Sequence, residues 1–105
     1  MNGIARIWRG TTKAENADAF ERFLKETVFP DFEKGLIGYR GAQLLKRTLN
    51  DQVEFTTIMW FDSIESVRLF AGEDYETAHI DPRVEKLLSQ YDLKSVHTEV
   101  CFSSI

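Results

Sequence analysis

Two histidines are the side chains of this chain best suited to acid–base chemistry near neutral pH. An imidazole accepts a proton there because its unperturbed pKa is about 6.5. His97 lies between Val96 and Thr98 in an alternating segment, so we expect it within a strand, as a candidate general base. His79 lies in a polar, irregular stretch, and we expect it at the mouth of a cavity on the helical side of a sheet. A hydrogen-bonded structural role is the alternative for either histidine.

Four further side chains are candidates for binding a substrate. Trp60 ends an apolar segment just before a helix start, where its indole could wall an aromatic pocket. Trp8 has one arginine two residues before it and another directly after it, and guanidinium groups stack on rings or pair with anions. Tyr39 and Arg40 lie between glycines, and a phenol beside a guanidinium suits an acidic substrate. Core packing of the aromatic residues and solvent exposure of Arg40 are the alternatives.

Residues 53–61 carry the clearest secondary-structure signal. Apolar, β-branched and aromatic residues alternate there with period two, which predicts a strand. Because both faces of its second half are apolar, the sheet must be covered on both sides. Asp62 or Ser63 then caps a helix that Gly72 ends. The apolar stripe predicted to bury this helix consists of Ile64, Val67, Leu69 and Phe70.

An earlier helix is predicted from a capping box, Thr12-x-x-Glu15, and begins at about Lys13. Proline inside a helix removes one backbone hydrogen bond and clashes with the preceding turn, so Pro30 predicts a kink near Thr27. The remaining elements are short. We expect strands over residues 4–9, 42–48 and 94–102, a connecting loop over 35–41, a tight turn over 49–52 and a helix over 83–90.

The order of these elements is β-α-β-β-α-(α)-β, which predicts an α+β fold. It corresponds to a ferredoxin-like, four-stranded antiparallel sheet with helices on one face, built from one domain over residues 1–105. A chain of this length cannot cover the second face of the sheet by itself. A homodimer that packs sheet on sheet is therefore expected.

Composition narrows the classes of partner. The chain has 13 Lys and Arg against 17 Asp and Glu, a net charge of −4, and no basic block, which argues against nucleic acid and against an anionic membrane surface. It contains one cysteine, no signal-peptide pattern and no apolar run long enough to span a bilayer. We therefore expect a cytoplasmic protein. No Cys/His spacing typical of a metal site is present, so neither a metal nor another cofactor is predicted.

Several segments together resemble the antibiotic biosynthesis monooxygenase family over nearly the whole chain. They read I-A-R-I-W-R-G at the start, then G-Y-R-G-A, then M-W-F-D-S-I-E-S-V-R-L-F-A-G-E-D-Y, and finally V-H-T-E-V. The resemblance implies a dimeric α+β barrel. It also implies one of two activities, cofactor-independent oxygenation of polycyclic aromatic compounds or degradation of haem, in a superfamily where fold alone does not decide function.

The haem-degrading branch of this superfamily can be compared residue by residue. The resemblance implies, for that branch, a catalytic set of an Asn on the first strand, a Trp on the helix after the third strand and a His further on. Those places correspond to Ile7, Leu69 and His79 here. Since only the histidine is retained, haem degradation is a minor alternative.

The leading hypothesis is a cofactor-independent monooxygenase that acts on a small aromatic or polyketide-like molecule. In this mechanism a histidine, His97 before His79, deprotonates a phenol or quinol, and the anion passes an electron to oxygen in a dry pocket. A non-catalytic dimeric barrel that binds a small ligand or a partner is the alternative.

Overall fold

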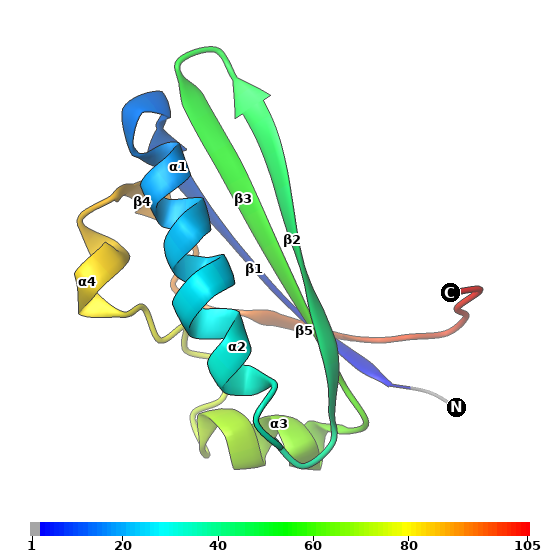
Figure 1. Ribbon diagram of the computed structural model, residues 1–105. Helices are drawn as coiled ribbons and strands as arrows, with labels where there is room; N and C mark the ends of the chain where they lie inside the picture. Colours follow the sequence, from blue (N-terminus) through cyan, green and yellow to red (C-terminus); the bar gives the residue numbers. More distant parts are fainter. Residues whose placement is uncertain (1–2) are drawn as a thin grey trace.

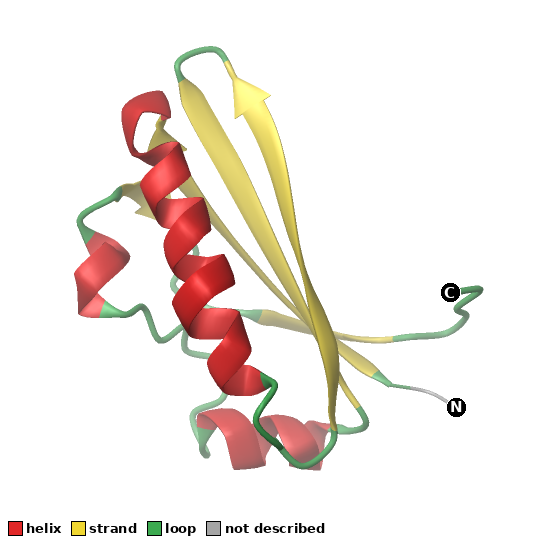
Figure 2. Cartoon of the chain, in the orientation of Figure 1, coloured by secondary structure: helices red, strands yellow, loops and turns green. Residues whose placement is uncertain are grey.

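The computed structural model describes residues 3–105, which form one layer of helices against one sheet (Figures 1 and 2). The elements in chain order are β1 (Ile4–Lys13), α1 (Ala14–Phe23), a π-helix η1 (Leu24–Val28), α2 (Phe29–Phe32), β2 (Tyr39–Leu49), β3 (Gln52–Phe61), α3 (Ile64–Ala71), α4 (Pro82–Glu85), β4 (Leu88–Tyr91) and β5 (Val96–Glu99). None of the helices in residues 3–105 is both long and apolar enough to cross a membrane.

The sheet is antiparallel throughout, with the order β2-β3-β1 followed by β4 and β5, which both pair with β1. This confirms the α+β, ferredoxin-like prediction, with five strands in place of four. The fourth position of the sheet is divided: β5 pairs with Ile4–Ile7, and β4 pairs with Gly10–Thr12. The continuous helix Ala14 to Phe32 runs across one face, and α3 lies across one end (Figure 1).

The helix predicted over residues 83–90 is wrong in its second half. The Asp81 side chain accepts a hydrogen bond from the Arg83 N–H and Pro82 occupies the first turn, so α4 starts as expected. It ends at Glu85, however, and a strand begins at Leu88. The reason is tertiary: β1 continues to Lys13, beyond the predicted end at Arg9, and its last backbone groups need the partners that β4 supplies.

The predicted capping box at the start of α1 is also wrong. Thr12 belongs to β1, where it pairs with Val53, and its buried hydroxyl has no hydrogen-bond partner within residues 3–105. Lys13 occupies the N-cap position and makes no side-chain capping bond. Thr12 is held in the ladder one residue before the N-cap position, so its hydroxyl is not where an N-cap side chain would accept from the first helical turn.

Pro30 acts as the sequence predicted, by disturbing the helix near Thr27, and the disturbance is a π-helical turn. The Phe29 N–H donates to the Leu24 carbonyl, five residues back, and α2 then begins with Pro30 in its first turn. The wider turn accommodates a residue that lacks an N–H and would clash in a regular helix. π-helical turns of this kind are frequent next to functional sites.

Two buried clusters fill the space between helices and sheet. The larger joins Trp8 and Phe55 of the sheet to Phe20 and Leu24 of the helix. The Phe20 ring lies between them, with centroids 6.5 Å from Trp8 and 5.0 Å from Phe55. The smaller cluster, built on Met59, Phe61 and Val67, packs α3 against the end of the sheet.

α3 is positioned by its N-terminus. The Ser63 side chain accepts a hydrogen bond of 3.2 Å from the Ser66 N–H, and Gly72 ends the helix with φ of 89°, as predicted. Gly38 packs against this turn, where a Cβ atom would lie 1.9 Å from the Ser66 hydroxyl oxygen. Leu69, predicted to be buried, is 69% exposed, because α3 turns Ser66 and Val67 inward instead.

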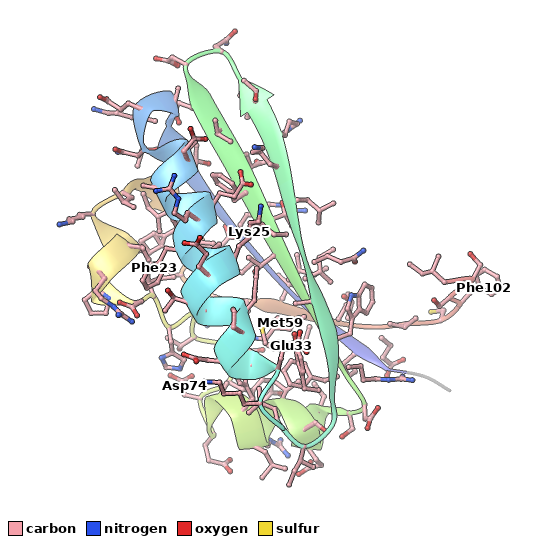
Figure 3. The ribbon with its side chains drawn as sticks, in the orientation of Figure 1. Phe23, Lys25, Glu33, Met59, Asp74 and Phe102 are labelled. Carbon is pink, nitrogen blue, oxygen red and sulfur yellow. The ribbon has the colours of Figure 1, made fainter. Side chains whose placement is uncertain are left out.

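The second face of the sheet carries apolar side chains that no element covers. In register, Ile7 of β1 lies between Ile58 of β3 and Val96 of β5, and the neighbouring Ala5 lies opposite Trp60. Val96 is 56% exposed. Beyond β5, the C-terminal extension leads away from the helical layer, with Phe102 almost fully exposed (Figure 3).

Candidate functional site

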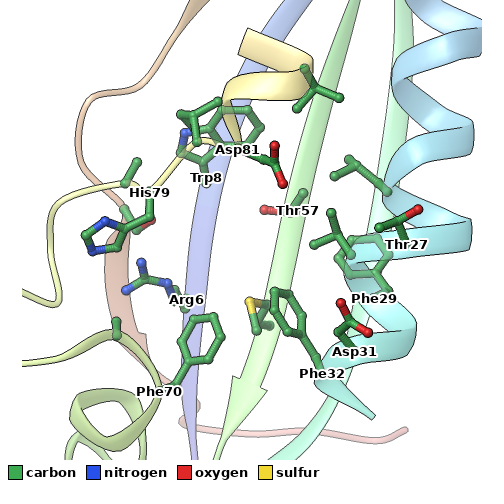
Figure 4. Close-up of a pocket in the computed structure, with 18 of the residues that line it drawn as sticks. Arg6, Trp8, Thr27, Phe29, Asp31, Phe32, Thr57, Phe70, His79 and Asp81 are labelled. Atoms are coloured by element: carbon green, nitrogen blue, oxygen red, sulfur yellow. The ribbon is translucent and has the colours of Figure 1, made fainter. Parts of the chain in front are cut away.

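A cavity of about 530 Å³ lies between the long helix, the sheet and the segment from α3 to α4 (Figure 4). The sheet contributes Arg6, Trp8, Thr57 and Met59, because alternation turns the even residues of β1 and the odd residues of β3 toward the helices. The helical wall comes from α1 and the π-helical turn, and the third wall from Phe70 and residues 78–84. The wall is therefore mainly aromatic and aliphatic, which suits a small hydrophobic ligand.

The π-helical turn shapes one side of this cavity. Thr27, Val28 and Phe29 all line it, directly before Pro30. In a regular α-helix successive residues are rotated by 100°, and the extra residue of a π-turn shifts the following side chains around the axis. Phe29 and Phe32 thereby reach the cavity from α2, and their rings meet edge to face at 6.2 Å.

Arg6 is the charged group of the cavity wall that is most deeply buried, with 6% of its surface exposed. Its Nη1 donates to the Tyr75 carbonyl and, at 2.9 Å, to His97 Nε2. The guanidinium carbon lies 5.7 Å from the centre of the Phe70 ring. Burial lowers the pKa of Arg6 from its ordinary value. A guanidinium nevertheless keeps its proton inside proteins, so the group is charged.

No carboxylate forms an ion pair with Arg6 among residues 3–105. Figure 4 shows Arg6 between Phe70 and His79, across the cavity from Phe29 and Asp31. Arginine is seldom so deeply buried without a paired anion. The cavity therefore has a buried positive charge at one end, in a wall that is otherwise mainly apolar and includes Asp31 and the Asp81–Arg83 pair.

His97 lies one contact away from the cavity and does not line it. It faces the helical side from β5, opposite Arg6 in the register, and meets the Tyr75 ring edge to face at 5.1 Å. Because arginine has only donors, His97 Nε2 must be the acceptor, and the ring is neutral with its proton on Nδ1. Burial and the Arg6 charge both lower the pKa of His97, which keeps it neutral. Its basic lone pair is thus occupied by Arg6.

His79 lines the cavity from the segment before α4, with an exposed side chain. The N–H of the preceding residue, Ala78, donates to the Leu93 carbonyl at 2.9 Å, which holds this segment against the chain beyond β4. The imidazole itself makes no hydrogen bond within residues 3–105, so both its nitrogens are available to a ligand. His79 and Arg6 both belong to the cavity wall, and Figure 4 shows them on the same side of it.

Trp8 lines the cavity and belongs to the core as well. It is 8% exposed, and its indole N–H donates to the Asp92 carbonyl at 2.9 Å, which fixes the plane of the ring. The Tyr91 ring packs against its other side, with centroids 6.4 Å apart. A rigid ring of this kind presents a flat apolar wall to a ligand.

The other three candidate binding residues lie outside the cavity. Trp60 belongs to the uncovered face of the sheet, where its indole N–H donates to Gln43. The Tyr39 hydroxyl donates to Glu33 at 3.1 Å, and burial, with help from Glu33, raises the pKa of Tyr39 to about 12. Arg40 is half exposed and pairs with Asp62 at 3.3 Å. Tyr39 and Arg40, predicted to lie in a loop that binds an acidic substrate, are instead the first two residues of β2.

Sequence reasoning treated Arg6 only as a neighbour of Trp8. Its alternation with Ile4 and Trp8 on one strand face contained the signal, since a cation on an inward apolar face is unusual. Asp81 and Arg83 at the cavity rim were also missed as a pair. They form a 2.7 Å ion pair in which hydrogen bonds from Arg83 lower the pKa of Asp81 to about 2.

Two features of residues 3–105 bear on metal and haem chemistry. Within residues 3–105, no three His, Cys, Asp or Glu side chains gather as a metal site would require. Ile7, at the place of the expected Asn, is on the face opposite the cavity, and Leu69 points to solvent.

Two solved structures share this fold over nearly the whole chain. A Bacillus cereus protein, provisionally named an antibiotic biosynthesis monooxygenase, matches with a TM-score of 0.62 and 17% identity, over 100% of this chain and 99% of that chain. Rv0793 from Mycobacterium tuberculosis matches with a TM-score of 0.62 and 14% identity, over 98% of this chain and 97% of that chain. The family resemblance seen in the sequence is therefore confirmed at the level of the fold. No family model and no curated protein sequence match the chain.

Proposed function

We propose that this protein is a cofactor-independent monooxygenase of a small aromatic substrate. The observation that carries the proposal is the aromatic cavity of about 530 Å³, which has His79 and the Arg6 charge on the same side of its wall. A phenol or an activated methylene bound there would lose its proton to His79. The anion that forms would be stabilised by the Arg6 charge.

The reaction needs molecular oxygen as its second substrate. The substrate carbanion transfers one electron to oxygen, and the two radicals combine to form a carbon-bound peroxide anion, which takes the proton held by His79 and becomes a hydroperoxide. Loss of water then leaves a carbonyl group. One oxygen atom enters the product and the other leaves as water, so the four-electron reduction of oxygen is balanced by oxidation of the methylene to a ketone.

His79 suits the role of base better than His97 in this arrangement. The lone pair of His97 accepts a hydrogen bond from Arg6, and its ring does not reach the cavity. A base must approach the proton it removes to within hydrogen-bonding distance. His97 is instead suited to holding the guanidinium of Arg6 in place.

The test is oxygen uptake with 1,8-dihydroxyanthrone, measured above the uncatalysed rate and without added flavin or metal. His79→Ala should lower the enzymatic rate by about 100- to 10,000-fold, the usual effect of removing a positioned base. Glu73→Ala is the matched control, because Glu73 is an exposed residue of the same segment that does not line the cavity. Equal loss in both variants would contradict the role of His79.

A binding protein without catalysis is the second candidate. It is favoured by one observation, that no hydrogen bond within residues 3–105 orients the exposed His79 imidazole. If the wild type consumes no oxygen but an aromatic compound raises its melting temperature, the cavity binds ligands and the monooxygenase proposal fails.

We also propose a homodimer that buries the uncovered face of the sheet. Ile7, Ile58 and Val96 are neighbours in the register there, and Trp60 extends the patch. An exposed apolar sheet face of this kind is a typical interaction surface. The proposal agrees with the isologous sheet packing expected from the sequence.

A further inference from the structure

We propose that Arg6 is a carboxylate-binding residue and that the ligand of the cavity is an aromatic carboxylic acid, held by two parallel hydrogen bonds from one edge of the guanidinium. The inference rests on the proposed function only in placing the substrate in the same cavity. It names the chemical class of that substrate, which the reaction itself leaves open.

The first argument is which nitrogens of the Arg6 guanidinium make hydrogen bonds and which do not. Arginine has five N–H donors. Both hydrogen bonds that Arg6 makes within residues 3–105 come from Nη1, to the Tyr75 carbonyl and to His97. Nε and Nη2 have no hydrogen-bond partner within residues 3–105, and their N–H bonds on the shared edge are parallel. This edge matches the two oxygens of a carboxylate.

The second argument is access. Arg6 is 94% buried as a residue, yet its free nitrogens are not sealed, since the Thr12 hydroxyl is the sole fully buried and unpaired side-chain polar atom found in residues 3–105. Arg6 lines the cavity, so the exposed part of the side chain faces that space. A buried charge that forms no ion pair within residues 3–105 attracts an anion more strongly than an arginine in water would.

The third argument is preorganisation. Tyr75 and His97 hold Nη1 from residues 69 and 91 positions away in sequence, and Phe70 lies beneath the guanidinium plane at 5.7 Å. The side chain therefore loses little freedom when a ligand binds. The aromatic wall formed by Trp8 and Phe29 then selects a ring rather than a small inorganic anion.

The experiment compares 2-naphthoate with its neutral counterpart of nearly equal shape, 2-naphthamide, by isothermal titration calorimetry on the full chain. The wild type should bind the carboxylate about 10- to 100-fold more tightly, the difference typical of a charge-assisted, bidentate pair. Arg6→Met should remove this preference. Arg6→Lys, which keeps the charge and loses the fork, should retain only a small part of it.

Arg22→Met is the matched control, because Arg22 is an exposed arginine of α1 that does not line the cavity, and its replacement removes the same charge. It should leave the preference unchanged. Equal affinity of the wild type for both compounds, or a preference that survives in Arg6→Lys at full strength, would overturn the inference. If Arg6→Met does not fold, as circular dichroism would show, the comparison of the two ligands in the wild type and in Arg6→Lys still decides.

The result is separable from the monooxygenase proposal. Selective binding of the carboxylate without oxygen uptake would retain the ligand class and reject the reaction. Oxygen uptake with a neutral anthrone, together with no preference for the carboxylate, would retain the reaction and reject the assignment of Arg6.

Discussion

Replacing Phe20 by alanine should destabilise the fold strongly and enlarge the cavity at the same time. Phe20 is 1% exposed, packs between Trp8 and Phe55, and also lines the cavity. Burial of roughly 150–250 Å² at about 25 cal/mol per Å² gives about 4–6 kcal/mol for the whole ring. Measured costs of Phe→Ala in cores are about 3–5 kcal/mol. We expect about 3 kcal/mol, since the new space opens into an existing cavity that water can enter.

Urea denaturation followed by tryptophan fluorescence would measure this loss, at one protein concentration so that any association is held constant. For a chain of this size, 3 kcal/mol corresponds to a melting temperature lower by roughly 12 °C. Phe23→Ala is the control: Phe23 lies on the same helix, partly buried beneath the Arg83 guanidinium at 4.9 Å, and its loss should cost about 1 kcal/mol. A smaller cost for Phe20→Ala than for Phe23→Ala would refute the packing described above.

Three further predictions concern the cap of α3, the uncovered sheet face and His97. Ser63→Ala removes the hydrogen bond to the Ser66 N–H and should cost about 1 kcal/mol, whereas Ser63→Asn should be nearly neutral; equal thermal shifts in the two variants would contradict this. Light scattering after size exclusion should give twice the chain mass for the wild type and a monomer for Ile58→Glu, and a wild-type monomer at micromolar concentration would reject the dimer. Burial and the Arg6 charge lower the pKa of His97, and Glu76 opposes them more weakly. As pH falls, the unfolded chain therefore takes up a proton at this histidine before the folded chain does. The contribution of His97 to the free energy of unfolding should fall as pH drops from about 6.5 through that lowered pKa. The wild type minus His97→Gln difference should therefore shrink below pH 6.5, and a difference that stays constant from about pH 7.5 to 5 would contradict the neutral, Arg6-bound imidazole.

Local patterns in the sequence were sufficient for the architecture. The period-two segment over residues 53–61 became β3, and the turn after Leu49 became a hairpin in which Asn50 has a φ of 57°. Ser63, Gly72 and Asp81 mark helix ends as predicted. These signals depend on backbone preferences and on the alternation of side chains within a few residues, so they can be read along the chain.

Errors in the predicted elements arose where distant segments compete for the same backbone. Thr12 has a good capping sequence, but the ladder with β3 extends to Lys13 and holds it in a strand. Leu88 continues an apolar pattern of helical spacing, yet pairing with β1 recruits it into β4. In both cases the hydrogen bonds of the sheet satisfy more backbone groups than the local alternative would.

In the candidate site, too, some features could be predicted from local sequence and others depended on distant contacts. From sequence, the histidines and tryptophans could be named by residue type, and alternation already put Arg6 on one strand face with Trp8. Tertiary structure alone decided that Trp60 lies on the opposite face from the cavity and that His97 accepts a hydrogen bond from Arg6, whereas the sequence already placed His79 at the mouth of a cavity. The contacts that bury Arg6 join residues 69 and 91 positions apart, beyond the range over which a local pattern carries information. The candidate residues can therefore be chosen from the sequence by their type. The neutral state of His97 and the free edge of Arg6, in contrast, depend on how α3, β1 and β5 pack around the Arg6 charge.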